Sequence, residues 1–344
     1  MREIVIVIAD LYAPPGATAA ALEAAALGAR LPGIGTVARC GERGPLAAGW
    51  RAWLAQWSGR AELAAVAPAW IAAACAPLSG ASGALWIATP LHLQASLTRV
   101  HLEHRGLLRL PVAEAAALAA DYERTLGGDG ARLVALDSGD FLFSAADTPA
   151  VASAEPARFA GAVLPALPGG AAAAALRRRV AEIEMWLHDH AVNRERAARG
   201  ALTVSALWPW GAEGQSVQPQ ARMPQDTPAA FGRDAWLGGL WHLQGSAVRV
   251  QPLDLQEVLE SDRERAVVVS EVAGESPRTE SDGHGVAGAL ARLDERLVAA
   301  AVEALRRGEL GRLTLIVNDV SVRLTRASLW RLWRRRRAPL APFA

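Results

Sequence analysis

Apolar residues follow two different spacings along the chain, and these spacings predict where strands and helices lie. Residues 3–9 and 266–272 are nearly continuous β-branched runs, which is typical of strands buried in a parallel sheet. Large apolar residues recur with helical spacing over 174–190 and 286–307, which predicts two long helices. Two short apolar runs on either side of Asn318-Asp319 predict a hairpin.

The remaining pattern alternates helices with strands. Further helices are expected over 18–29, 46–56, 62–75, 111–126, 234–243 and 326–337. Further strands are expected over 84–89, 96–103, 132–136, 140–143, 203–208 and 247–250. This order predicts an α/β fold, in which a mixed sheet has helices on both faces and antiparallel hairpins at its edges.

A segment rich in alanine, proline and glycine divides the chain near its middle. It covers residues 145–173, and segments of this composition commonly join domains. A chain of 344 residues has room for two domains of ordinary size. We therefore expect an N-terminal α/β region over 1–168 and a C-terminal α/β region over 169–344.

The composition excludes several classes of enzyme. Hydrophobic residues make up 51% of the chain, which is enough for a sizeable core. The 36 basic residues balance 35 acidic ones, so the overall charge indicates neither nucleic acid nor a membrane as partner. All of the basic residues are arginine. Without lysine there is no P-loop lysine, no kinase lysine and no Schiff base, which excludes P-loop NTPases, protein kinases and pyridoxal-phosphate enzymes.

Two features predict a cytoplasmic location. Cys40 and Cys75 lie far apart and lack the spacing of metal ligands, which fits a reducing compartment better than a disulfide scaffold. The apolar run near the N-terminus is interrupted at Asp10, so it is too short for a signal peptide or a membrane span. We therefore expect a cytoplasmic protein that does not enter a membrane.

The densest group of polar residues lies at the end of the predicted helix over 174–190. If that helix continues, Asp189, Asn193 and Arg196 share one polar face, and a strand then leads to a Trp-Pro-Trp-Gly turn. This pattern has two interpretations: a pocket for a small anionic ligand or a protein partner, or a buried network that fixes a helix to a strand. The candidate binding residues are Asp189, His190, Asn193, Arg196, Trp208, Trp210 and Gly211.

The same segment carries a resemblance to a known family. The spacing of its residues resembles a motif of the archaeal-type, cofactor-independent phosphoglycerate mutases, at Asp189, His190, Asn193, Arg196, Gly200, Trp208, Trp210, Gly211 and Gly214. The block 182–190 and the tail 324–335 are more similar still to a proteobacterial group of phosphoglycerate-mutase-like proteins, the RpfE-type regulatory proteins. The resemblance covers about residues 175–340, with Ala191 where the family has proline.

The resemblance implies a metal-dependent enzyme, but the residues for this chemistry are incomplete in the sequence. The mutases need two divalent metal ions held by Asp and His, and a serine that becomes phosphorylated. Here the first strand leads to Asp10 without the family's following glycine. His101 and His104 do not share a face of a strand, and residues 281–285 have a glycine inserted between Asp and His. We therefore expect no catalytic residue, no metal and no cofactor.

These observations lead to one hypothesis of function and one enzymatic alternative. The leading hypothesis is a phosphoglycerate-mutase-like protein that is not catalytic and that has a regulatory role, binding a small ligand or a protein partner. The alternative is an active metal-dependent phosphoglycerate mutase or phosphatase.

The basic C-terminal tail suggests a second alternative. Tryptophan and arginine are interleaved over 330–337, which ends in Arg334, Arg335, Arg336 and Arg337. Such a tail could bind nucleic acid, or a nucleic-acid enzyme, through phosphate groups or acidic side chains. In the structural interpretation, the tryptophans anchor a helix and the arginines lie at its C-terminus. We expect Trp330 and Trp333 to be buried and the arginines to be exposed.

Overall fold

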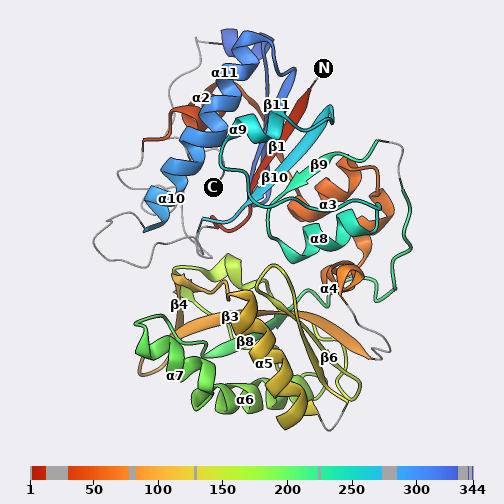
Figure 1. The fold of residues 1–344 in the computed structure, drawn as a ribbon, viewed down its shortest axis with the longest axis vertical. Helices are drawn as coiled ribbons and strands as arrows, with labels where there is room; N and C mark the ends of the chain where they lie inside the picture. Colours follow the sequence, from red (N-terminus) through yellow and green to blue (C-terminus); the bar gives the residue numbers. More distant parts are fainter. Residues whose placement is uncertain are drawn as a thin grey trace. The chain divides into compact units, whose positions relative to one another are not determined.

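Two compact units share the chain and interleave in sequence (Figure 1). The structure, a computed structural model, describes residues 2–12, 30–76, 83–127, 130–223, 226–272, 285–331, 340 and 343. The first unit comprises Met1–Ala64, Met223–Arg233 and Gln244–Ala344, and the second comprises Ala65–Arg222 and Asp234–Leu243. The helix expected over 18–29 lies outside the described residues.

Within the described residues, a mixed six-stranded sheet forms the centre of the first unit. Its order is β2-β12-β11-β1-β10-β9; strands β11, β1, β10 and β9 run parallel, and β12 and β2 add antiparallel pairs. The bounds are β1 (Glu3–Ile8), β2 (Glu42–Pro45), β9 (Ala229–Phe231), β10 (Arg265–Ser270), β11 (Arg312–Val317) and β12 (Val320–Thr325). The two β-branched runs are the neighbours β1 and β10, so their burial in a parallel sheet is confirmed.

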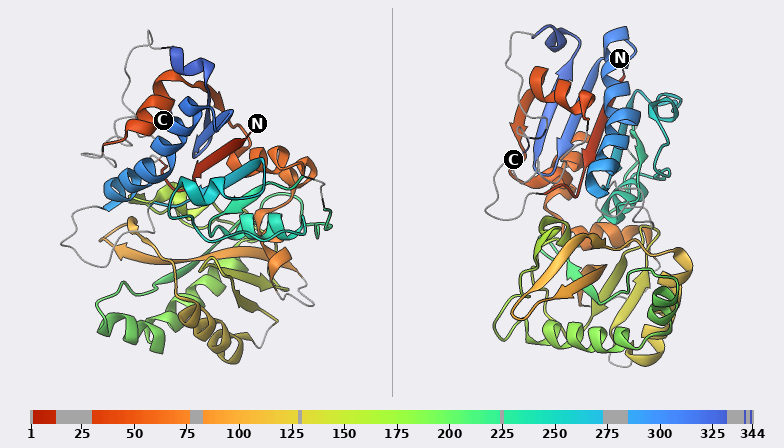
Figure 2. Two further views of the ribbon diagram at one scale, coloured as in Figure 1. Left: turned by 45° about the horizontal axis from the view of Figure 1, so that its top comes forward. Right: turned by 90° about the vertical axis from the view of Figure 1, so that its left-hand side faces the viewer.

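The helices of the first unit share a buried apolar cluster with this sheet. Ile34 and Val37 of α2 (Pro32–Cys40) and Leu305 of α11 (Ala300–Arg307) belong to it. The helix expected over 286–307 consists of α10 (Gly285–Leu293), the π-helical segment η6 (Asp294–Ala299) and α11, which follow one another beside the sheet (Figure 2). The other helical segments are α3 (Gly49–Trp57), η1 (Ala61–Ala65), α9 (Leu255–Leu259) and η7 (Ala327–Trp330).

An antiparallel sheet forms the second unit. Its order is β5-β6-β3-β4-β7, and β8 also pairs with β3. The bounds are β3 (Ala84–Ala95), β4 (Val100–Leu107), β5 (Arg132–Ala135), β6 (Phe141–Ala145), β7 (Ala162–Val163) and β8 (Ala206–Trp210). The expected hairpin around 132–143 is confirmed as β5 and β6. Both sheets together confirm the α/β class with a mixed sheet.

The helices of the second unit complete its core. They are α4 (Pro68–Ala72), η2 (Ala73–Cys75), α5 (Val112–Thr125), η4 (Pro156–Phe159), α6 (Ala174–His188), α7 (Ala191–Ala198) and α8 (Ala235–His242). Leu176, Val180 and Ile183 of α6 are buried in one cluster with Trp86 of β3. The boundary expected at residue 168 therefore falls inside this unit, because segments on both sides of it share one core.

Several expectations differ from the structure. The strand expected over 247–250 is wrong, because Arg249 there forms only an isolated bridge with Phe231. The single helix over 62–75 is interrupted, because Pro68 begins α4 as a separate short helix after η1. The expected burial of Trp330 is wrong: this side chain ends the short segment η7 and is 75% exposed. Trp333 and Arg334–Arg337 lie outside the described residues. Among the helices that the structure describes, none is both long and apolar enough to cross a membrane.

Candidate functional site

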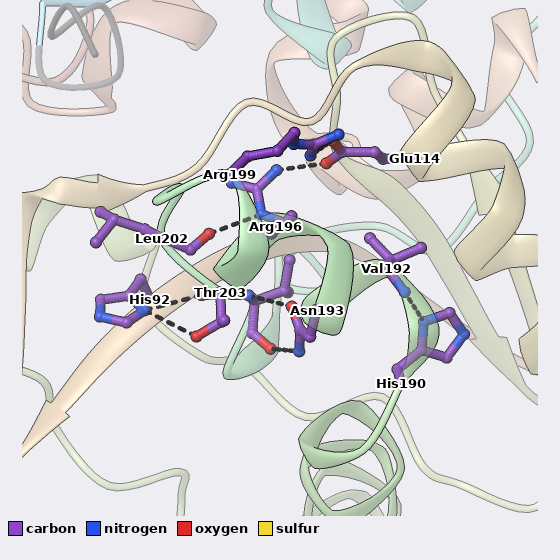
Figure 3. A network of polar contacts seen from close by, with 10 residues as sticks. His92, Glu114, His190, Val192, Asn193, Arg196, Arg199, Leu202 and Thr203 are labelled. Carbon is purple, nitrogen blue, oxygen red and sulfur yellow. Dashed lines mark hydrogen bonds and ion pairs between the residues drawn. The ribbon is translucent and has the colours of Figure 1, made fainter. Parts of the chain in front are cut away.

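The polar segment identified in the sequence consists of two helices rather than one (Figure 3). α6 ends at His188, and α7 begins three residues later with His190 as its N-cap. The Nδ1 atom of His190 accepts a hydrogen bond from the backbone N–H of Val192 at 3.1 Å, which caps the start of the second helix. The condition for one polar face shared by Asp189, Asn193 and Arg196, a helix that continues past residue 190, is therefore not met. Asp189 is exposed at the break, whereas Asn193 is buried.

Asn193 joins α7 to the segment that leads into β8. Its Nδ2 donates to the carbonyl oxygens of Leu187 at 2.7 Å and Val204 at 2.8 Å. Its Oδ1 accepts from the backbone N–H of Val204 at 2.8 Å. The residue is 6% exposed. A buried amide that uses both of its ends in this way is typical of a structural connection.

Arg196 is likewise held by internal partners. Its Nε donates to the carbonyl oxygen of Leu202 at 2.7 Å, and its guanidinium pairs with Glu114 of α5. Glu114 also pairs with Arg199 at the end of α7. Arg196 is therefore held by internal partners, although the one carboxylate of Glu114 is shared by two guanidinium groups and leaves one of their positive charges uncompensated.

His190 also connects α7 to α5. Its Nε2 donates to Oδ2 of Asp121 at 3.0 Å, and Nε1 of Trp186 donates to the same oxygen at 3.1 Å. Since its Nδ1 accepts from a backbone N–H, these bonds assign the neutral tautomer with the proton on Nε2. Burial opposes the ionisation of Asp121, but the hydrogen bond from Trp186 and the charge of Arg124 outweigh it and lower the pKa of this carboxyl.

Trp208 and Trp210, expected in a turn, lie in strand β8 and belong to a separate network in the same unit. Nε1 of Trp208 donates to the carbonyl oxygen of Ala154 at 2.9 Å. Nε1 of Trp210 donates to Oγ1 of Thr89 at 2.9 Å, and this hydroxyl donates to Oδ1 of Asp140 at 2.9 Å. The two indoles thus fix β8 to the elements around it.

Gly211 follows β8 in a conformation that glycine tolerates best. Its φ is +77°, and a Cβ at this position would lie 3.2 Å from Cβ of Pro68. Its carbonyl oxygen accepts from the backbone N–H of Ala69 at 2.9 Å. The glycine therefore allows β8 to approach the start of α4.

The candidate residues divide between the two networks. Asn193 contacts Val204 before β8, and Trp210 lies at the other end of that strand. At about 3.3 Å per residue, the chain between these two positions spans about 20 Å. These contacts favour the interpretation of a buried network that fixes helices to a strand, and a pocket built from this segment stays a prediction.

The first unit has a second group of polar residues where its parallel strands end. Ile8 of β1 is in register with Ser270 of β10 and with Val317 of β11, so the three strands end side by side. Ligands of parallel α/β sheets commonly bind at the carboxyl ends of the strands. We call this region, with Asp10, Ser270, Asn318 and Asp319, the carboxyl edge.

Asp10 and Asn318 connect the strand ends to one another. Oδ1 of Asp10 accepts from the backbone N–H of Val272 at 2.8 Å. Nδ2 of Asn318 donates to the carbonyl oxygen of Leu11. The backbone N–H of Asn318 donates to the carbonyl oxygen of Ile8 at 3.2 Å. The two residues are 3% and 5% exposed, respectively.

Asn318 has one buried atom without a hydrogen bond. Among the described residues, its Oδ1 has no hydrogen-bond partner, although the Nδ2 of the same amide is bonded. Its φ is +55°, a left-handed conformation that asparagine adopts more readily than most residues. A buried acceptor without a donor costs about 1–3 kcal/mol. In the sequence this residue indicates only a turn; its place directly after a buried apolar run was the signal that could have marked it.

Other polar side chains surround this position. The hydroxyl of Tyr12 donates to Oδ1 of Asp319 at 3.4 Å. Nε2 of Gln251 donates to Oγ of Ser270 at 2.5 Å. The carboxyl edge thus consists of carboxylates, amides and hydroxyls from four segments that are far apart in sequence.

The metal pair implied by the mutase resemblance does not fit the side chains described here. Across the described ranges, no three His, Cys, Asp or Glu side chains gather closely enough to hold a metal ion. At the carboxyl edge, Oδ1 of Asp10 accepts a hydrogen bond from a backbone N–H. The residue after the neighbouring strand β11 is an amide, Asn318, in place of a second carboxylate. Asp282 and His284 lie outside the described residues.

Comparisons with known proteins give distant similarities only. No protein-family model matches the chain, and no curated protein matches it in sequence. Among solved structures, the PH0037 protein from Pyrococcus horikoshii is similar with a TM-score of 0.47 and 13% identity, over 94% of this chain and 87% of that one. The cofactor-independent phosphoglycerate mutase from Thermoplasma acidophilum DSM 1728 is similar with a TM-score of 0.36 and 17% identity, over 94% of this chain and 90% of that one.

Proposed function

We propose that this chain is a non-catalytic, phosphoglycerate-mutase-like protein with a regulatory role, and that it binds a ligand at the carboxyl edge of its first unit. The observation that carries this proposal is the buried, unpartnered Oδ1 of Asn318 beside Asp10. An amide oxygen that lacks a hydrogen bond supports a site that binds a ligand through hydrogen bonds rather than through a metal ion. The sequence blocks 182–190 and 324–335 support a place among the RpfE-type regulatory proteins.

The segment around Asn193 supports the same proposal indirectly. An anion pocket there would need Arg196 to be available, but this guanidinium is bonded to Glu114 and to the carbonyl oxygen of Leu202. The binding role is therefore assigned to the carboxyl edge, and the motif residues are assigned the role of holding the second unit together.

Enzyme assays test the absence of catalysis. Purified protein is supplied with 2- and 3-phosphoglycerate and with a chromogenic phosphate monoester, each with Mn²⁺ or Mg²⁺. The Asp10→Ala variant serves as control, because Asp10 is the carboxylate that the resemblance would assign to a metal. We expect the same background rate from both proteins. Turnover that is lost in Asp10→Ala and abolished by a chelator would establish the enzymatic alternative.

The exposure of Trp330 favours a second candidate, contact with nucleic acid through the tail. This indole is 75% exposed, and Arg331 beside it pairs with Glu42. An exposed tryptophan next to arginines can stack on a base. In this case Trp330→Ala would weaken binding to single-stranded DNA or RNA in a salt-dependent manner while changing the free energy of unfolding by less than about 0.5 kcal/mol. Binding that is absent at low salt would rule this candidate out.

A further inference from the structure

We propose that the outer face of β2 and β12 binds a single-stranded nucleic acid, with phosphates at Arg323 and Arg331 and a base stacked on Trp330. The inference rests on the second candidate function given above, and it places the phosphate contact on the folded part of the first unit instead of on residues 334–337. It does not depend on a ligand at the carboxyl edge.

The first step concerns the side chains that gather at this edge of the sheet. Arg323 of β12 and Glu42 of β2 are register partners in neighbouring antiparallel strands, so their side chains project from the same face. Nη2 of Arg331 pairs with Oε1 of Glu42 at 2.6 Å, which brings a second guanidinium to that face. Trp330 directly precedes Arg331 in the chain and is 75% exposed. Two cations and an exposed indole therefore lie around one carboxylate.

The second step concerns charge. Residues 320–331 contain three arginines and no acidic residue. Arg323 is exposed, and across the described ranges its guanidinium takes part in no ion pair or hydrogen bond. The carboxylate of Glu42 balances at most one of the two guanidinium groups beside it. The excess of positive charge at this accessible surface attracts an anionic chain.

The third step selects the kind of anionic chain. A single strand of nucleic acid presents a phosphate and an unpaired base in each nucleotide, so it can occupy a guanidinium and an indole at the same time. A duplex keeps its bases stacked on one another and offers mainly phosphates to this surface. An acidic peptide would use the arginines but would not require an exposed flat ring. The exposure of Trp330 beside Arg331 therefore favours the single strand.

Arg326 provides a matched control on the same segment. It is exposed and carries the same charge as Arg323, but its Nη1 lies 3.4 Å from the position that a Cβ of Gly308 would take. Gly308 is the C-cap of α11, where a cation complements the helix dipole. Loss of Arg326 therefore tests whether binding follows the net charge of the protein or the face of β2 and β12.

Fluorescence anisotropy of the full chain with a labelled oligothymidine, repeated over a series of salt concentrations, tests the inference. Each phosphate contact to a single strand adds about 0.7 to the slope of log K against log salt concentration. We expect Arg323→Ala to reduce this slope by about 0.7. Trp330→Ala should weaken binding about tenfold and leave the slope unchanged. Arg326→Ala should leave the slope unchanged and the affinity within about twofold of the native value.

Glu42→Gln gives a result that misfolding cannot produce. It removes the carboxylate that holds Arg331, so a phosphate can take its place. Because an exposed ion pair of this kind is weak, we expect binding about threefold tighter than that of the native chain. Thermal unfolding of every variant checks that the fold is kept.

The outcomes separate this inference from the second candidate function. Equal effects of Arg323→Ala and Arg326→Ala would overturn the inference, because binding would then follow net charge alone. Duplex DNA or polyglutamate that binds as tightly as the single strand would also overturn it. If Trp330→Ala weakens binding but Arg323→Ala does not, the inference is wrong and the second candidate function stands. If the native chain does not bind oligothymidine at low salt, both are wrong.

Discussion

At the scale of single residues, Asn193 shows how a polar motif can serve stability. Its side chain makes three hydrogen bonds in a buried position, to Leu187 and Val204. Asn193→Ala removes all three and leaves buried backbone groups unpaired, so we expect a loss of about 3 kcal/mol in the free energy of unfolding. Chemical denaturation measures this value. Asp189→Ala, at the exposed break between the helices, should stay within about 0.5 kcal/mol of the native chain.

Asp294 provides a pH dependence at the same scale. It is completely buried at the start of the π-helical segment, and its oxygens accept from the backbone N–H groups of Gly33 at 3.0 Å and Ile34 at 2.6 Å. Burial raises its pKa from 3.8 to about 6, against the opposing effect of these two hydrogen bonds.

The sign of the effect follows from this raised pKa. The folded protein binds the proton more tightly than the unfolded chain, so the contribution to stability is complete below about pH 4 and is lost as the pH rises through about 6. Asp294→Asn has no carboxyl to ionise. The stability of the native chain relative to this variant should therefore fall by about 2 kcal/mol between pH 4 and pH 7. A difference that rises with pH, measured by urea denaturation, would contradict this account of Asp294.

At the scale of elements, the start of α7 allows a test at Ala191. Ala191 is the first residue of α7, directly after the N-cap His190, whose φ of −69° and ψ of 142° suit the residue before a proline. Proline is favoured at this helix position because its missing N–H has no helical partner. We expect Ala191→Pro to stabilise the protein by about 0.4–1 kcal/mol. Ala197→Pro, inside the same helix, should destabilise it by about 3 kcal/mol or more, and thermal unfolding would show both.

Elements with a strong local pattern were predictable, and those decided by a cap or a distant contact were not. Leu176, Val180 and Ile183 follow helical spacing and are buried as expected. The break after α6 depends on a histidine side chain that accepts from Val192, which apolar spacing does not reveal. The π-helical segment depends on Gly33, where a Cβ would lie 2.4 Å from the backbone nitrogen of Ala299.

At the scale of the whole molecule, the division into units was not predictable from composition. β9 and α8 are separated by three residues in sequence, yet they belong to different units. The Ala-, Pro- and Gly-rich segment that suggested a boundary lies within one unit instead. The candidate site also depends on contacts between distant parts of the sequence. Asp10, Ser270 and Asn318 come together only because β1, β10 and β11 run parallel and end side by side. Local patterns identify such strands but not their order in the sheet.

The central claim, a binding role in place of metal-dependent catalysis, has one most direct test. Electron paramagnetic resonance of a Mn²⁺ solution measures free ions, because bound Mn²⁺ loses most of its six-line signal. With metal-free protein added at increasing concentration, the account predicts a free Mn²⁺ signal that stays unchanged at micromolar concentrations. A loss of signal that corresponds to two ions per chain, reversed in the Asp10→Ala variant, would contradict it.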